Sequence, residues 1–164
     1  MEMQDEIRLP VSITDVWTAL NDPHILEQAI PGCTSLTQET QTSLSARVKI
    51  KIGPVSANFK GNVTLSDMDP PHAYTISGSG TGGVAGSAKG SAKVTLRAQG
   101  DETILSYDVS ASVSGKIAQL GSRLIESTAK KLSLQFFDNF TNLISPETPE
   151  TPADESSANE SSAN

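Results

Sequence analysis

Hydrophobic and polar residues alternate along several stretches in the middle of the chain. In one of them, Ala46, Val48, Ile50 and Ile52 share one parity, and arginine or lysine occupies the positions between. The same alternation recurs over residues 57–66, 74–80, 88–97 and 105–113. A period of two is typical of strands with one buried and one solvated face. The pattern predicts an antiparallel meander.

Residues 78–93, GSGTGGVAGSAKGSAK, have the composition of a flexible linker. Their alternation, however, continues without a break into the strand-like residues that follow. We therefore predict a strand over 87–98 and a turn near Gly82 and Gly83. The inward positions of this stretch are glycine or alanine, and glycine in a strand often marks a close approach by something else. Either a helix lies tightly against the sheet here, or the space is left for a ligand.

Helical signals lie at both ends of this strand region. After a short strand over 4–9, Ser12 is placed to cap a helix, and Asp22 followed by Pro23 starts a second short helix that runs to Ala29. From Gly115 to Ile144 the chain has no proline and shows helical periodicity. Roughly 28 residues would form a rod of about 42 Å, which is long enough to cross a sheet.

These elements predict an α+β fold of the helix-grip type. A curved antiparallel sheet wraps around one long C-terminal helix, and two short helices lie near the N-terminus. Such a grip encloses a cavity wherever the facing side chains are too small to fill it. We expect the ligand-contacting residues to be Trp17, Ile30, Phe59, Val63, Tyr74, Ile76, Gly78, Gly90, Ala92, Tyr107, Leu124, Thr128 and Phe136.

The charge of the chain is unevenly distributed. Its 164 residues carry a formal charge of −7, but five of the 19 acidic residues lie in 146–164. The remaining 14 acidic residues nearly balance the 12 basic ones, so residues 1–145 have a net charge of −2. This charge gives no indication of nucleic-acid binding. We expect 1–145 to form one domain and the acidic Pro/Glu/Ser-rich segment 146–164 to be disordered.

Location and chemistry are constrained by what the chain contains. The single cysteine, Cys33, suggests a reducing compartment. We see no signal peptide and no apolar run that could span a bilayer, which predicts a cytoplasmic protein. His24 and His72 lie beside prolines, and no metal-binding or catalytic motif is apparent. Cys33 is interpreted as a small buried hydrophobe, and we expect neither a metal nor a catalytic residue.

A basic stripe is predicted on the outward face of the strands. It consists of Arg47, Lys49, Lys51 and Lys60 on one strand pair, and of Lys89, Lys93 and Arg97 on another. Such lysines commonly form a solvated face that protects strand edges. The alternative is a docking face for acidic lipid headgroups or an acidic partner.

Several stretches resemble the carbon monoxide dehydrogenase G-subunit family, which belongs to the START and Bet v 1-like superfamily. They are VSITDVWTALNDPHILEQAIPGC, VKIKIGPVSANFKG, GSGTGGVAGSAKGSAKV and SGKIAQLGSRLIESTAKKL, and they occur in the order that the family has. The resemblance covers residues 3–144 and implies a helix-grip fold with an apolar ligand cavity. Membrane-anchored members of the family carry an apolar or amphipathic segment after the domain, whereas residues 146–164 contain none.

The resemblance implies a partner, a molybdenum-containing hydroxylase of the carbon monoxide dehydrogenase type. We therefore expect a non-enzymatic accessory protein that binds a quinone or lipid non-covalently. It would recruit or couple the hydroxylase to the cytoplasmic membrane, and a peripheral position at the inner face of that membrane is compatible with this role. Two alternatives remain: a cyclase- or hydrolase-like enzyme of the same superfamily, and an assembly factor that works without a ligand.

Overall fold

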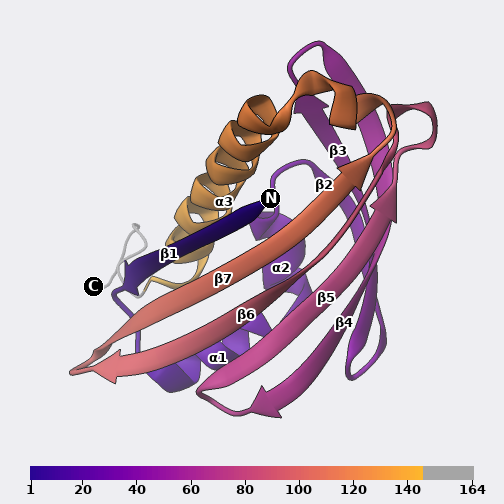
Figure 1. The fold of residues 1–164 in the computed structure, drawn as a ribbon. Coiled ribbons are helices and arrows are strands. Elements are labelled where there is room, and N and C mark those ends of the chain that lie inside the picture. The colour runs from indigo at the N-terminus through magenta and orange to yellow at the C-terminus, as the bar shows by residue number, and fades with distance from the viewer. Residues whose placement is uncertain (146–164) are drawn as a thin grey trace, which may run out of the picture.

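The computed structural model describes residues 1–145; the disorder expected for 146–164 lies outside these residues. Seven strands form one antiparallel sheet in the order β1-β7-β6-β5-β4-β3-β2. The strands are β1 (Glu2–Leu9), β2 (Cys33–Thr40), β3 (Ser43–Ile52), β4 (Val55–Asp69), β5 (Ala73–Thr81), β6 (Ser87–Gln99) and β7 (Glu102–Ser114). Figure 1 shows the sheet curving around a long helix, α3 (Ser122–Ile144). The predicted helix-grip fold is confirmed.

The strand periodicity predicts which side chains face inward. Along β4, the positions 55–66 alternate between half-buried and exposed, and the half-buried ones carry the apolar side chains. β6 follows the same rule, and the inward-facing Val94 and Leu96 near its end are buried. The Gly-rich stretch is therefore strand on both sides of a short 3-10 turn, η1 (Gly83–Ala85).

Two short helices connect β1 to β2 and begin at the expected residues. In α1 (Ile13–Leu20), the Ser12 hydroxyl accepts a hydrogen bond from the backbone N–H of Asp15. In α2 (Pro23–Ala29), the Asp22 carboxylate accepts one from the backbone N–H of His24. These bonds satisfy N–H groups that a helix start would otherwise leave without partners.

The C-terminal helix is shorter than the sequence pattern predicted. Residues Lys116–Leu120 form a 3-10 turn, η2, and α3 begins only at Ser122. Gly121 separates the two with a φ of 94° and a ψ of 149°, an extended left-handed conformation that interrupts the helix. The 23 residues of α3 span about 34 Å instead of 42 Å. Leu143, in the last turn of α3, is exposed.

The core lies between the lower half of the sheet in Figure 1, the two short helices and the second half of α3. Phe140, Leu9, Val16 and Ala29 are completely buried there. The side-chain amide of Asn139 donates to the carbonyl of Ala29 at 3.1 Å and thereby ties α3 to α2. This packing fixes α3 over the concave face.

The small residues of β5 and β6 have a role that neither sequence-based alternative foresaw. A Cβ built on Gly90 would lie 2.6 Å from the carbonyl oxygen of Ser110, and one on Gly78 would lie 3.0 Å from that of Asn62. Both oxygens belong to the backbone of neighbouring strands. The glycines are therefore required where adjacent strands approach each other in the bent sheet. This approach accounts for the glycines without a tightly packed helix or a ligand.

Candidate functional site

An apolar cavity of about 320 Å³ lies between the concave face of the sheet and the helices. This volume is at the lower end of the range for small-molecule sites. The inward side chains that the strands contribute to it are mostly large, and side chains of α2 and α3 line the other side. Its lining consists of Leu20, Asn21, Leu26, Ile30, Leu36, Gln38, Gln41, Leu44, Val63, Leu65, Tyr74, Ile76, Val94, Leu105, Phe136 and Phe137.

Three amide side chains mark one end of this lining. Gln38 lies near the end of β2, Gln41 lies in the turn between β2 and β3, and Asn21 lies between the two short helices. Both glutamines are exposed, so the cavity reaches solvent at this end. The Asn21 amide donates to the carbonyl of Trp17 at 2.9 Å, which leaves its own oxygen as an acceptor. We refer to Asn21, Gln38 and Gln41 as the mouth.

Aromatic rings form the wall that α3 contributes. Phe136 and Phe137 meet edge to face at 5.0 Å, and both line the cavity. Behind them, Phe136 stacks on Phe140 at 5.7 Å, and Phe137 stacks on Tyr107 at 5.5 Å. Neighbouring rings in these arrangements hold each other in place. The wall therefore presents rigid ring surfaces to anything inside the cavity.

Tyr74 is the one residue with an ionisable side chain among the described residues of the lining, and it is 4% exposed. Its ring meets that of Trp17 edge to face at 5.2 Å. Within residues 1–145, its hydroxyl makes no hydrogen bond, although buried hydroxyl groups are normally paired. Burial raises the pKa of Tyr74 far above its ordinary value, so the hydroxyl remains protonated. It is a neutral polar group in an otherwise apolar part of the cavity.

Five of the thirteen residues predicted to contact a ligand line the cavity: Ile30, Val63, Tyr74, Ile76 and Phe136. Their role in binding stays a prediction. Trp17 and Tyr107 pack behind lining residues and do not face the cavity.

The other six predicted residues lie outside the lining as well. Phe59 packs against Gly82 near η1, and Leu124 packs against the turn at Gly53. Gly78 and Gly90 lie in the bent part of the sheet. Neither Ala92 nor Thr128 reaches the cavity. The cavity therefore lies among the large inward residues of the sheet. It does not lie at the small ones, because their missing side chains allow neighbouring strands to approach each other.

Sequence reasoning missed the residues contributed by β2 and by the turn after it. Leu36 and Gln38 share one parity, so the alternation that identified the other strands also indicates that both face one side. Phe137 was missed because it lies next to Phe136, outside the spacing of the predicted helical face. Leu20 and Leu26 come from the helices that cover the cavity, and no strand pattern identifies them.

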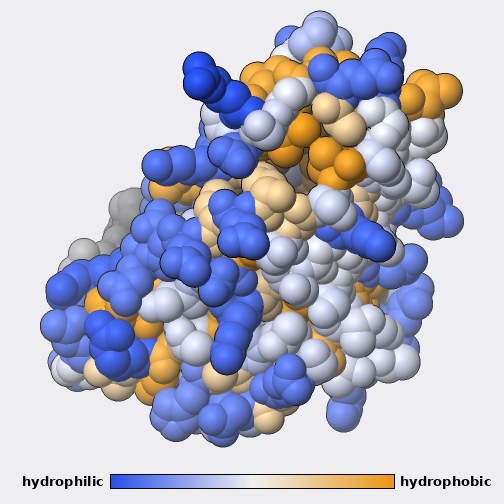
Figure 2. All heavy atoms as spheres, in the orientation of Figure 1, coloured by the Kyte–Doolittle hydropathy of each residue, from blue (hydrophilic) through white to orange (hydrophobic). Residues whose placement is uncertain are grey.

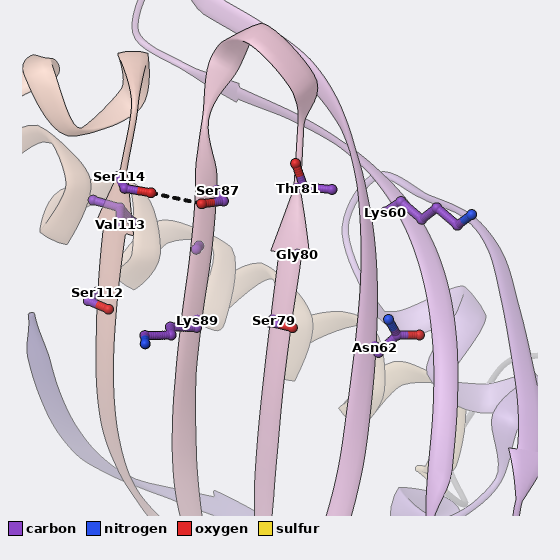
Figure 3. Close-up of a pocket in the computed structure, with 11 residues that line it drawn as sticks. Lys60, Asn62, Ser79, Gly80, Thr81, Ser87, Lys89, Ser112, Val113 and Ser114 are labelled. Atoms are coloured by element: carbon purple, nitrogen blue, oxygen red, sulfur yellow. Dashed lines mark hydrogen bonds between the residues drawn. The ribbon is translucent and has the colours of Figure 1, made fainter.

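A second hollow, of about 550 Å³, lies on the outer face of the sheet. Figure 3 shows its short polar side chains on neighbouring strands, with the Ser87 and Ser114 hydroxyls hydrogen-bonded at 2.8 Å. Lys60 and Lys89 belong to its rim and are exposed. No acid–base pair or buried polar group faces this hollow among the residues that the structure describes. The apolar cavity is therefore the stronger candidate site.

The remaining reactive groups lie elsewhere. Cys33 is half-buried at the start of β2, and its pKa is raised by burial and by the charge of Glu27, against a lowering by the backbone of Ser35. Residues 1–145 contain no cluster of three ligating side chains that could hold a metal ion. Within the same residues, no helix combines the length and the apolar character required to cross a bilayer.

The fold is shared with several solved structures. A conserved protein from Geobacillus kaustophilus is 30% identical, with a TM-score of 0.83 over 88% of this chain and 95% of that one. The Zhui aromatase/cyclase from Streptomyces sp. R1128 is 12% identical, with a TM-score of 0.61 over 88% and 93% of the two chains. Truncated norcoclaurine synthase from Thalictrum flavum is 14% identical, with a TM-score of 0.63 over 90% and 95%.

Among curated proteins, none matches the sequence. The family model for CoxG, the G-subunit of carbon monoxide dehydrogenase, in contrast, matches residues 6–145. That range contains every strand except the first residues of β1, all the helices and the whole cavity lining. The chain belongs to the carbon monoxide dehydrogenase G-subunit (CoxG) family.

Proposed function

We propose that this protein is a non-enzymatic accessory protein that carries an apolar ligand, foremost a quinone, in the cavity between sheet and α3. In this role it recruits or couples a molybdenum-containing hydroxylase of the carbon monoxide dehydrogenase type to the cytoplasmic membrane. The apolar cavity is the observation that carries the ligand-binding part of the proposal. Membership of the CoxG family supports the partner.

The lining favours binding over turnover. Its described residues include no aspartate, glutamate, histidine or lysine, and Tyr74 stays neutral. General acid–base catalysis requires a group that exchanges a proton near the working pH, and none of these lining residues does so. A cyclase-like enzyme, which two structural neighbours suggest by their names, would need such a group against its substrate. An assembly factor without a ligand would have no use for a cavity of about 320 Å³.

The polar atoms of the cavity indicate the chemistry of the ligand. Most of the lining is aliphatic or aromatic, so the bulk of the ligand is apolar. The Tyr74 hydroxyl, which has no partner within residues 1–145, suits a neutral oxygen that accepts a hydrogen bond. The rings of Phe136 and Phe137 suit a flat ring beside that oxygen. A quinone combines these features, whereas a plain hydrocarbon tail offers Tyr74 no acceptor.

Ligand binding is tested with a matched pair of probes, decylbenzoquinone and decylbenzene, which differ in the two carbonyl oxygens. The fluorescence of Trp17, the only tryptophan, reports on the cavity because its ring contacts Tyr74 at 5.2 Å. We expect saturable quenching by the quinone. Native mass spectrometry of the freshly purified protein would show whether a ligand of this class is retained.

Two variants of β4 serve as control and test. Val63→Phe adds volume inside the cavity and should weaken quinone binding, whereas Met68→Phe lies on the exposed part of the strand and should not. If neither a quinone nor a long-chain fatty acid binds saturably, the ligand-binding part of the proposal is wrong. Capture of the tagged protein from its own cells should recover a molybdenum hydroxylase, and repeated failure to do so would remove the partner.

A further inference from the structure

One end of the molecule gathers three turns that are far apart in the sequence. They are the β3–β4 turn (51–55), η1 with its flanking glycines (82–86), and η2 with the start of α3 (115–124). Gly53 packs against the side chain of Leu124, and the backbone of Gly86 lies against that of Ser114 and Gly115. Figure 1 shows all three at the upper end, opposite the β4–β5 and β6–β7 turns. We call these three segments the tip.

The tip exposes an apolar side chain that the fold does not use. Val84 is 94% exposed, the highest value of any large hydrophobic residue among those described. It lies in the sequence Gly82-Gly83-Val84-Ala85-Gly86, where Ala85 is buried and the glycines have no side chains. Val84 is therefore the projecting group of η1. In Figure 2, further hydrophobic atoms surface at this end of the molecule, between blue hydrophilic ones.

The charged residues of the tip are basic. Lys51, Lys116 and Arg123 are exposed there, and none of them forms an ion pair within residues 1–145. The two ion pairs found within that range both lie at the other end, Arg8 with Glu102 at 2.9 Å and Arg97 with Glu6 at 3.9 Å.

Acidic residues avoid the segments that build the tip. None occurs in residues 43–66, 70–100 or 109–125. At the opposite end, Asp67 and Asp69 lie in the last residues of β4, and Asp101 and Glu102 lie where β6 turns into β7. The three segments of the tip are thus basic, although the described part of the chain is nearly neutral.

We propose that the tip docks on the surface of an anionic lipid bilayer. Basic residues close to such a surface gain attraction from its negative potential, and the acidic end is repelled from it, so both effects orient the tip toward the bilayer. Val84 then enters the interfacial region, where an apolar side chain is removed from water. An acidic protein would neutralise the same lysines, but a lone projecting valine needs a matching pocket there, whereas a bilayer adapts to its shape.

This docking surface is separate from the cavity. The inference rests on the membrane role in the proposed function and names the part of the molecule that contacts the membrane. It is tested without any cavity ligand. The full chain is sedimented with vesicles of phosphatidylcholine mixed with phosphatidylglycerol, and with vesicles of phosphatidylcholine alone. We expect binding to the first, little binding to the second, and release by salt.

Each basic residue near an anionic surface contributes about fivefold in affinity, so Lys116→Gln and Arg123→Gln should each weaken vesicle binding by about that factor. Val84→Asp should weaken it by at least as much. The matched controls lie at the opposite end: Met68→Asp places the same change at another exposed hydrophobe, and Arg97→Gln removes another exposed charge. Both should bind vesicles like the unchanged protein.

Equal binding to both kinds of vesicle, or equal losses in the tip variants and the controls, overturns the proposal. So does a result in which the tip variants keep vesicle binding but lose capture of the hydroxylase, because the tip is then a protein-docking surface. A protein that binds decylbenzoquinone but no vesicle refutes docking and leaves the ligand-binding role intact. A protein that binds vesicles through the tip but binds no quinone refutes the ligand-binding role and leaves the docking proposal intact.

Discussion

Replacing Tyr74 by phenylalanine should stabilise the protein and weaken its binding to a quinone. The substitution removes one hydroxyl that is buried and lacks a hydrogen-bond partner within residues 1–145. Leaving such a group buried costs about 1–3 kcal/mol, which its removal recovers. For a domain of this size, each kcal/mol corresponds to about 2–4 °C in Tm. If the hydroxyl donates to a quinone oxygen, its loss costs about 0.5–1.5 kcal/mol of binding, or roughly two- to tenfold in Kd.

Tyr107→Phe provides the matched control. Burial and the charge of Asp5 raise the pKa of Tyr107, and the side chain of Ser133, whose hydroxyl donates to the carbonyl of Ala129 at 2.9 Å, acts against them. Because the Tyr107 hydroxyl has this polar neighbour, its removal should not stabilise the protein and should cost at most about 1.5 kcal/mol. Because Tyr107 lies outside the cavity lining, the affinity for the quinone should not change.

The folded and unfolded states of the chain also differ in the pH at which Tyr74 loses its proton. The pKa of Tyr74 is raised in the folded protein, so on increasing pH the unfolded chain releases this proton first, near pH 10. The folded state then binds more protons than the unfolded state, and its stability falls as the pH rises above about 10. The Tyr74→Phe protein lacks this ionisable group and therefore does not lose stability through it. The difference in stability between the two proteins should therefore grow in alkali.

Urea unfolding at neutral and alkaline pH, together with a titration of decylbenzoquinone and decylbenzene, measures all of these effects. The reasoning is refuted if Tyr74→Phe is destabilised by more than about 0.5 kcal/mol, the lower limit for a lost hydrogen bond. In that case the hydroxyl has a partner in the free protein. An equal loss of affinity for the quinone and for decylbenzene would show that the hydroxyl does not recognise an oxygen.

Two further predictions concern the bent sheet and the thiol. Gly90→Ala should cost about 1–3 kcal/mol, because its Cβ would lie 2.6 Å from the carbonyl oxygen of Ser110. Gly80→Ala, whose nearest contact would be 3.5 Å, should be neutral or slightly stabilising in urea unfolding; similar costs for both would contradict the close approach of the strands. Cys33 should react with iodoacetamide several-fold more slowly in the folded protein than in urea, since its pKa is raised chiefly by burial. Reaction at the same rate in both states would show an activated thiol.

The sheet could be predicted from the sequence because inward and outward positions alternate without error through five strands. This worked even over 78–93, where composition alone indicates a linker. The long helix was predicted too early, since a glycine that fits a helical pattern can equally leave it, as Gly121 does with a φ of 94°. Periodicity carries no information on which of two allowed conformations a glycine adopts.

The structure has a cavity on the concave face, as the sequence suggested, but the small residues predicted to contact a ligand lie outside its lining. Small inward residues such as Gly78 and Gly90 suggest empty space if the sheet is assumed to have uniform spacing. In the folded protein, their missing side chains allow neighbouring backbones to approach. The cavity of the folded protein is lined by large strand residues such as Leu36, Leu65 and Ile76, together with Phe136 and Phe137 of α3. Which of these residues meet across the cavity depends on the curvature of the whole sheet, and no single strand pattern encodes that curvature.

The mouth of the cavity and the tip lie at opposite ends of β3. Gln41 precedes the first residue of this strand and Gly53 follows its last, and its ten residues span about 33 Å. A molecule seated on a bilayer by its tip therefore holds the opening in the aqueous phase, several Debye lengths from the headgroups at physiological salt. If the cavity carries a quinone between a partner enzyme and the membrane, as proposed, exchange with the membrane requires a second orientation of the molecule.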